Sequence, residues 1–159
     1  NGDSGTTSRV LSTFLTWLSE KTSPVFVVAT ANNIEMIPPE IIRKGRFDEV
    51  FFLALPTKQE RASIFKVHLR KARPDQMEKF VQHLLFFGDL SQEFSGAEIE
   101  QVIIEAMRIG YNNNRDLEVE DIIRSIQKLV PLARTKQKEL ALLKEWFESG
   151  NVVSASKYK

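Results

Sequence analysis

Residues 25–48 read VFVVATANNIEMIPPEIIRKGRFD, and the fold class is easiest to infer from this stretch. Its first five residues, 25–29, are all apolar and include three valines. A short β-branched run of this kind predicts a strand buried on both faces, inside a parallel sheet covered by helices. The run ends in the polar cluster 30–33. Because ligands bind at the carboxyl ends of strands in open α/β sheets, this cluster is a candidate site.

A second apolar run follows at residues 50–54, and Pro56 closes it. This run predicts another buried strand. Between the two strands, Pro38 and Pro39 favour a short helix that Gly45 ends. Two strands do not make a stable covered sheet by themselves, so we expect the sheet to be incomplete in this chain.

The chain on either side of these strands has helical periodicity. Two capping boxes, Thr57 with Glu60 and Ser95 with Glu98, mark helix starts. The expected helices cover residues 9–21, 57–73, 75–87, 95–110, 119–130 and 135–149. We expect the last nine residues to form a tail.

Composition narrows the possible functions. The chain has 22 Lys and Arg against 21 Asp and Glu, a net charge of +1, which provides no overall field to attract nucleic acid or an anionic membrane. It has no cysteine and only two histidines, so disulfides are excluded and a transition-metal site is not expected. No apolar run approaches the roughly 20 residues that span a bilayer. Since residue 1 is Asn and not Met, we expect the chain to be part of a longer protein.

Four motifs, in this order, resemble the second half of an AAA+ ATPase module. They are the strand that ends in Thr-Ala-Asn at 30–32, the IIRKGRFD octet at 41–48, FKVHLR at 65–70 and FSGAEI at 94–99. The resemblance covers about residues 2–130. The opening from Gly2 to Leu18 is similar to AAA+ ATPases that cyanobacteria and some algal plastids encode as a hypothetical reading frame.

The resemblance implies the domain organisation. Residues 1–56 would be an α/β fragment of a P-loop NTPase core, residues 57–130 an all-α lid, and residues 131–159 a C-terminal helix and tail. The chain would then be mainly helical.

The resemblance also implies catalytic residues. Asn32 matches sensor 1, whose carboxamide orients the water that attacks the γ-phosphate. The order Thr-Ala-Asn departs from the usual Ala-Thr-Asn, so Asn33 is a second candidate. Arg43 and Arg46 match arginine fingers, which reach the phosphates of a neighbouring subunit. From residue type alone, a structural role explains these residues better: Asn32 would cap the loop after the strand, and each arginine would pair with a nearby carboxylate such as Glu40 or Asp48.

Three residues of the lid would contact the nucleotide. The resemblance places His68 near the ribose or base, and Gly96 and Ala97 in the sensor 2 region, where a helix start approaches the phosphates. Without the resemblance, His68 would be interpreted as a packed histidine beside the apolar residues around it.

The phosphate-binding half of such a site is missing from this sequence. None of the seven glycines is followed by Lys, so there is no Walker A motif, and there is no Walker B acidic pair after an apolar strand. We therefore expect this chain alone to be inactive. In the full-length protein the resemblance implies ATP and Mg²⁺ as cofactors and a ring, expected to be a hexamer. It also implies an unidentified macromolecular client and a location in the cytoplasm or plastid stroma.

Two alternatives from other functional classes stay open. One is a non-catalytic helical protein-interaction module that never binds nucleotide. The other is a clamp-loader-like subunit that binds nucleic acid, which rests only on the basic residues of helix 57–73. A solvated helix face explains those residues better, because no aromatic stacking platform accompanies them, and nucleic acid is not an expected partner.

Overall fold

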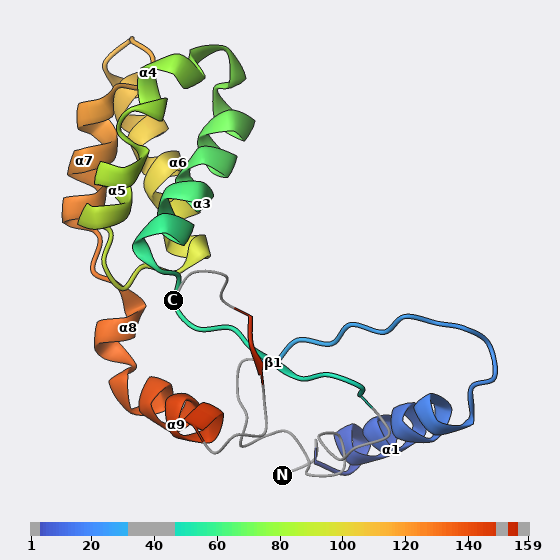
Figure 1. The fold of residues 1–159 in the computed structure, drawn as a ribbon. Helices are drawn as coiled ribbons and strands as arrows, with labels where there is room; N and C mark the ends of the chain where they lie inside the picture. Colours follow the sequence, from blue (N-terminus) through green and yellow to red (C-terminus); the bar gives the residue numbers. More distant parts are fainter. Residues whose placement is uncertain (1–3, 32–46, 149–152, 156–159) are drawn as a thin grey trace. The chain divides into compact units, whose positions relative to one another are not determined.

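The computed structural model describes residues 4–31, 47–148 and 153–155 (Figure 1). The chain separates into two compact units. The first comprises residues 1–52 and 146–153, and the second comprises residues 53–145 and 154–159. The domain boundaries expected after residues 56 and 130 stay predictions.

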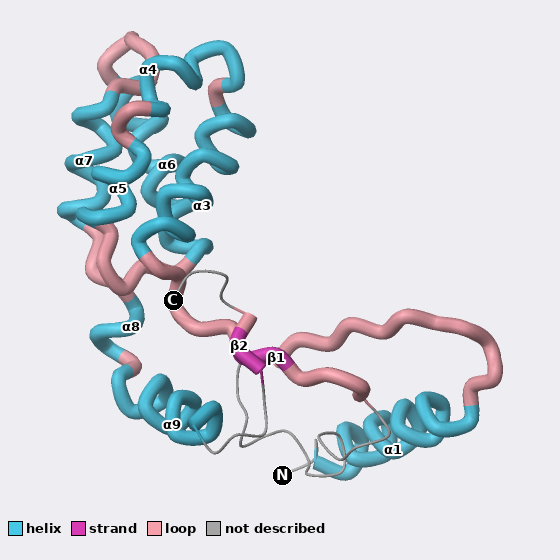
Figure 2. The backbone as a smooth tube through the Cα atoms, in the orientation of Figure 1, coloured by secondary structure: helices cyan, strands magenta, loops and turns pink. Residues whose placement is uncertain are grey.

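The first unit contains one long helix and a short strand pairing. Helix α1 (Ser4–Glu20) extends the helix expected at 9–21 toward the N-terminus. Leu15 is buried, and the rings of Phe14 and Trp17 stack with their centroids 5.9 Å apart. Strand β1 (Phe51–Phe52) pairs with β2 (Val153–Ser154), so part of the expected C-terminal tail is a strand (Figure 2).

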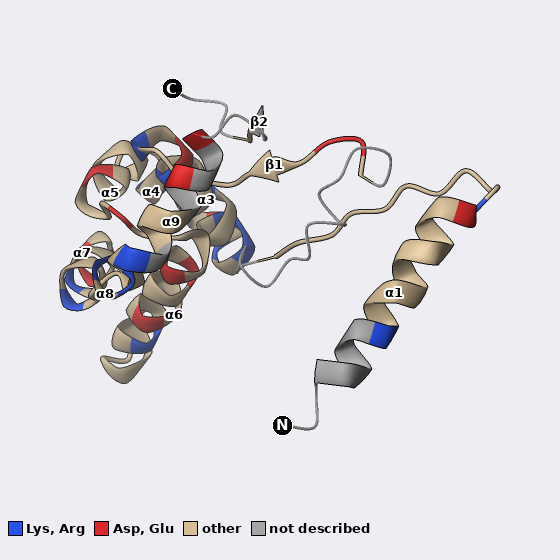
Figure 3. Ribbon diagram, turned by 90° about the horizontal axis from the view of Figure 1, so that it is seen from below, with Lys and Arg blue, Asp and Glu red and all other residues tan. Residues whose placement is uncertain are grey.

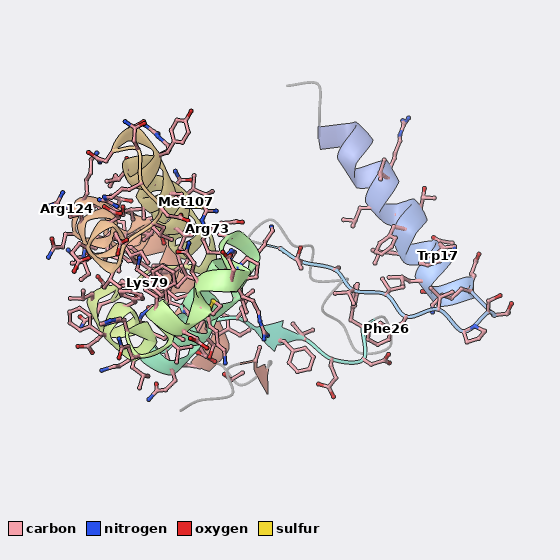
Figure 4. All side chains as sticks on the ribbon, turned by 90° about the horizontal axis from the view of Figure 1, so that it is seen from above. Trp17, Phe26, Arg73, Lys79, Met107 and Arg124 are labelled. Atoms are coloured by element: carbon pink, nitrogen blue, oxygen red, sulfur yellow. The ribbon has the colours of Figure 1, made fainter. Side chains whose placement is uncertain are left out.

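The expectation of a buried strand at residues 25–29 is wrong for the described structure. The segment forms no strand, and Phe26 is 93% exposed (Figure 4). A strand needs neighbours that bond its backbone and cover its faces, and the described residues place none beside this segment. For the same reason the second expected strand, 50–54, is a strand only at the two residues of β1, which pair with β2.

The second unit is a helical bundle. Its elements are α3 (Lys58–Ala72), η1 (Pro74–Gln76), α4 (Met77–Val81), α5 (Leu84–Leu90), α6 (Gly96–Asn112), α7 (Val119–Lys128), α8 (Leu132–Thr135) and most of α9 (Gln137–Glu148). Helix α3 packs on α5 and α6, and α7 packs on the same two helices, so these four enclose one core (Figure 1).

Apolar side chains from every side of the bundle fill this core. The buried cluster consists of Phe65, Leu69, Phe80, Phe87, Phe94, Ile99, Val102, Ile103, Ala106, Leu117, Ile122 and Ile126. The rings of Phe65 on α3 and Phe87 on α5 lie 5.5 Å apart between centroids. Because this apolar cluster lies wholly within the second unit, that unit has a core of its own.

Both capping boxes predicted from the sequence are confirmed. The Glu60 carboxylate accepts the Thr57 N–H at 2.8 Å, and the Glu98 carboxylate accepts the Ser95 N–H at 2.7 Å. Each Thr or Ser hydroxyl in turn accepts the N–H of its Glu. These bonds satisfy N–H groups that have no partner within the helix, so α3 and α6 begin where the sequence indicates.

The helix expected at 75–87 is wrong in detail. The chain forms η1, α4 and α5 instead, and α5 continues through Gly88 to Leu90. A Cβ atom at Gly88 would lie 2.5 Å from the Lys58 carbonyl oxygen and 3.3 Å from the Ala62 Cβ. Gly88 therefore does not end the helix. It allows the backbone of α5 to approach that of α3.

Replacing Gly88 with Ala should destabilise the bundle by about 1–3 kcal/mol, because the added methyl group meets backbone that cannot move aside. Urea denaturation of the chain measures the free energy of unfolding. Gly96→Ala is the matched control: the nearest atom to its new Cβ is 3.9 Å away, so no loss is expected. Equal stabilities for the two variants would contradict the close approach.

Candidate functional site

Three of the six expected site residues, Asn32, Arg43 and Arg46, lie outside the described residues. The second candidate for sensor 1, Asn33, lies outside them as well. The three residues expected in the lid, His68, Gly96 and Ala97, are described, and all of them belong to the second unit. The described geometry is therefore that of the expected lid side of the site.

His68 lies on α3 at the border between core and solvent. Its neighbours in the helix, Phe65 and Leu69, are buried, whereas the His68 side chain is 23% exposed. The His68 Nδ1 atom is 3.5 Å from the Glu100 Oε1 atom on α6. Thus the imidazole is held next to a carboxylate and keeps an exposed edge, unlike a histidine fully packed in the core.

Gly96 and Ala97 begin α6 beside the same part of α3. The Cδ1 atom of Ile64 is the nearest neighbour of a Cβ built at Gly96. Ile64 and His68 are one turn apart on α3, as Gly96 and Glu100 are on α6. The fold therefore brings His68 and the start of α6 to one side of the α3–α6 pair, within about one helical turn of each other.

The start of α6 combines free N–H groups with a nearby carboxylate. Gly96 and Ala97 occupy first-turn positions, where backbone N–H groups have no partner within the helix and favour an anion. The Glu98 carboxylate accepts hydrogen bonds from Ser95 and from the Leu132 N–H. Burial raises the pKa of Glu98, but these hydrogen bonds outweigh it, and the pKa is lowered overall.

Arg61 is a structural residue that the sequence analysis placed on a solvated basic face. It is only 8% exposed. Its Nε donates to the Gly88 carbonyl at 2.9 Å, and its Nη1 donates to the Pro56 carbonyl at 2.5 Å. Burial lowers the pKa of Arg61, and Asp89 acts in the opposite direction. The sequence does contain a sign that Arg61 is buried, because Arg61 lies four residues before Phe65 and eight before Leu69, on the same face of the helix.

Residues 1–55 match the family described as "ATPase family associated with various cellular activities (AAA)". The chain is 55% identical to the AAA domain-containing protein ycf46 of Guillardia theta over 156 residues, which is 98% of this chain and 30% of that relative. It is 53% identical to ycf46 of Pyropia yezoensis, with similar coverage. The chain belongs to the AAA family.

More distant relatives match a shorter stretch. This AAA chain is 33% identical to the proteasome-activating nucleotidase of Aeropyrum pernix over 111 residues, 66% of the chain and 25% of that relative. The chain spans only about 30% of the length of its ycf46 relatives. Among the described residues, no helix of this AAA chain is long and apolar enough to cross a membrane. Nor do those residues contain a group of His, Cys, Asp or Glu side chains that could hold a metal ion.

The basic helix of this AAA chain carries less free charge than its sequence suggests. Lys58 pairs with Asp89 at 2.8 Å, Arg73 pairs with Asp116 at 2.7 Å, and Arg61 is buried. Acidic and basic residues are interspersed over the helices (Figure 3). A face of mixed charge gives little support to the nucleic-acid-binding alternative.

A polar network closes the end of the bundle where α6 turns into α7. Arg115 forms a two-pronged ion pair with Asp121, at 2.5 and 2.8 Å, and Asp121 is 1% exposed. Beside it, Asp116 accepts hydrogen bonds from the Arg73 side chain, the Leu117 N–H and the Gln76 amide. The hydrogen bond from Arg73, followed by that from Leu117, lowers the pKa of Asp116 from 3.8 to about 2.

The lowered pKa of Asp116 predicts a pH-dependent contribution to stability. The unfolded chain binds a proton to this carboxyl near its ordinary pKa, above the folded value. The contribution of the Asp116 carboxylate to the free energy of unfolding is therefore present above about pH 4 and is lost as the pH falls toward 2. Urea denaturation of the wild type and Asp116→Asn should show a stability gap that narrows over this range. High salt should shrink the gap, because the pair is exposed. A gap independent of pH would contradict the assignment.

Proposed function

We propose that this chain is the sensor, arginine-finger and lid part of an AAA+ ATPase. In the full-length protein, ATP binds between the α/β core and the lid and is hydrolysed there. The observation that carries the proposal is the 55% identity to an AAA domain-containing protein over 98% of the chain. The match to the AAA family over residues 1–55 supports it.

Core residues would perform the chemistry. Asn32, with Asn33 as the alternative, holds the attacking water in line with the γ-phosphate through its carboxamide. Arg43 and Arg46 extend from one subunit toward the nucleotide of its neighbour. A guanidinium is always charged and has a planar fork of donors, so it stabilises the negative charge that develops on the transferred phosphoryl group.

Lid residues would hold the nucleotide. His68 presents its exposed edge to the ribose or base, while the Glu100 carboxylate beside Nδ1 keeps the ring in one orientation. The first-turn N–H groups of Gly96 and Ala97 face the phosphates, where a helix start favours an anion. That all three lie on one side of the α3–α6 pair supports this assignment.

The proposal for the remaining features of the full-length protein rests on its resemblance to the AAA+ ATPases. ATP and Mg²⁺ are its cofactors, and the ligands of the Mg²⁺ come from outside this chain. Subunits assemble into a ring, proposed to be a hexamer, because a finger that acts in trans requires a neighbour. Hydrolysis moves the lid against the core and does mechanical work on a macromolecular client, in the cytoplasm or the plastid stroma.

Arg46→Ala in the full-length protein should lower ATP turnover by on the order of 10³-fold, because it removes a charge that acts in the transition state. The Kd for ATP should stay the same, since the finger belongs to the neighbouring subunit. Arg70→Ala, which removes an exposed arginine on α3, is the matched control and should leave both quantities unchanged. Unchanged turnover in Arg46→Ala would contradict the finger assignment.

The purified 159-residue chain should show no ATP turnover in a phosphate-release assay. Its sequence has no Walker A motif to cradle the phosphates, so the lid residues have no bound nucleotide to act on. ATP turnover that persists after further purification would refute the proposal that the phosphate-binding half of the site lies outside this chain. If the full-length protein also fails to bind ATP, the non-catalytic interaction module becomes the better interpretation.

A further inference from the structure

Helix α8 is bonded to the loop that leads into α6. The chain enters α8 through Pro131, which is buried. The Leu132 N–H donates to the Glu98 Oε1 atom at 2.6 Å, and the Arg134 Nε donates to the Glu93 Oε2 atom at 2.9 Å. Two polar contacts and a buried proline therefore hold this short helix against residues 93–98.

Glu98 is shared between two helix starts. Its Oε2 atom accepts the Ser95 N–H and the Ser95 hydroxyl, both at 2.7 Å, and thereby caps α6. Its Oε1 atom accepts the Leu132 N–H at the start of α8. A single carboxylate thus connects the first turn of α6 to the first turn of α8, so a movement of α8 acts directly on the cap of α6.

Glu93 is held in a conformation that its residue type disfavours. Its φ is +66°, in the left-handed region that costs most residues free energy. The neighbouring Ser91 and Phe94 are buried, and Arg134 pairs with the Glu93 carboxylate. The loop is therefore held by its buried residues Ser91 and Phe94 and, through the ion pair of Arg134 with Glu93, by α8.

We propose that α8 positions the turn formed by Ser95, Gly96 and Ala97, so that the segment after Pro131 controls how tightly the lid binds nucleotide. This inference rests on the proposed function, since it concerns the same Gly96–Ala97 turn. When α8 is released, the turn is in its binding geometry for a smaller fraction of the time. The apparent Kd for ATP equals the intrinsic Kd divided by that fraction, so it rises as the fraction falls.

Leu132→Pro is the sharpest test, because it removes the single N–H that reaches Glu98. The first position of a helix tolerates proline, and Pro131 has φ −64° and ψ 137°, a conformation suited to the residue before a proline. The Ser95–Glu98 capping box is left intact. Leu132→Ala is the matched control: it keeps the N–H and removes a side chain that is 56% exposed.

Both variants are made in the full-length protein and compared by hydrogen exchange and ATP binding. Leu132→Pro should speed the exchange of amides 96–99 and raise the Kd for ATP about threefold to tenfold, the scale of one hydrogen bond. Leu132→Ala should match the wild type in the exchange of amides 96–99 and in the Kd for ATP. Arg134→Glu, which sets two like charges together, should act in the same direction as Leu132→Pro, and the double variant E93K with R134E should restore binding.

The outcomes separate the two proposals. If wild-type full-length protein binds no ATP, the proposed function fails, and hydrogen exchange still tests the contact. Unchanged exchange in both Leu132→Pro and Arg134→Glu overturns the contact between α8 and the turn. Faster exchange with an unchanged Kd overturns its role in binding.

Discussion

The second unit depends on how closely α5 lies against α3. At Gly88 the two backbones leave no room for a methyl group, and this close approach brings the rings of Phe87 and Phe65 into contact in the core. Arg61 reinforces the same junction, because its guanidinium donates to the Gly88 carbonyl and to the Pro56 carbonyl. One buried cation thus bonds the segment that enters α3 to the helix that packs across it. Helices α6 and α7 pack on this pair and complete the core.

The main role of the charged residues in this unit is to form ion pairs between separate parts of the chain, rather than to create an electrostatic field. Lys58 and Arg73, near the two ends of α3, pair with carboxylates on α5 and in the loop after α6. Asp121 is almost fully buried and is paired on both oxygens by Arg115. A buried carboxylate with these partners stabilises one arrangement of the α6–α7 turn, because its loss would leave the guanidinium without its bidentate acceptor. The net charge of +1 gives no indication of these ion pairs.

The lid side of the proposed site combines a partly exposed imidazole with a helix start. Both lie along the α3–α6 pair. The Glu100 carboxylate lies next to the imidazole, and the Glu98 carboxylate caps the helix start. Glu98 also bonds to α8, so the residues after the bundle are physically connected to this side of the unit. The segment that follows the proposed lid in sequence is thereby bonded to it.

Local signals in the sequence determined the starts of α3 and α6, the mainly helical content and the family. The capping boxes at Thr57 and Ser95 each join residues three positions apart, so their spacing in the sequence is enough to predict them. The motifs from residue 25 to residue 99 sufficed to indicate an AAA chain, which the comparisons confirmed. Tertiary structure alone decided the role of Gly88, the burial of Arg61, the pairing of the basic helix and the contact of Leu132 with Glu98. Each of these depends on residues 27 to 43 positions apart, and no local pattern specifies which distant groups will meet. The strand expected at residues 25–29 failed for the same reason, because a strand exists only where a neighbour bonds its backbone.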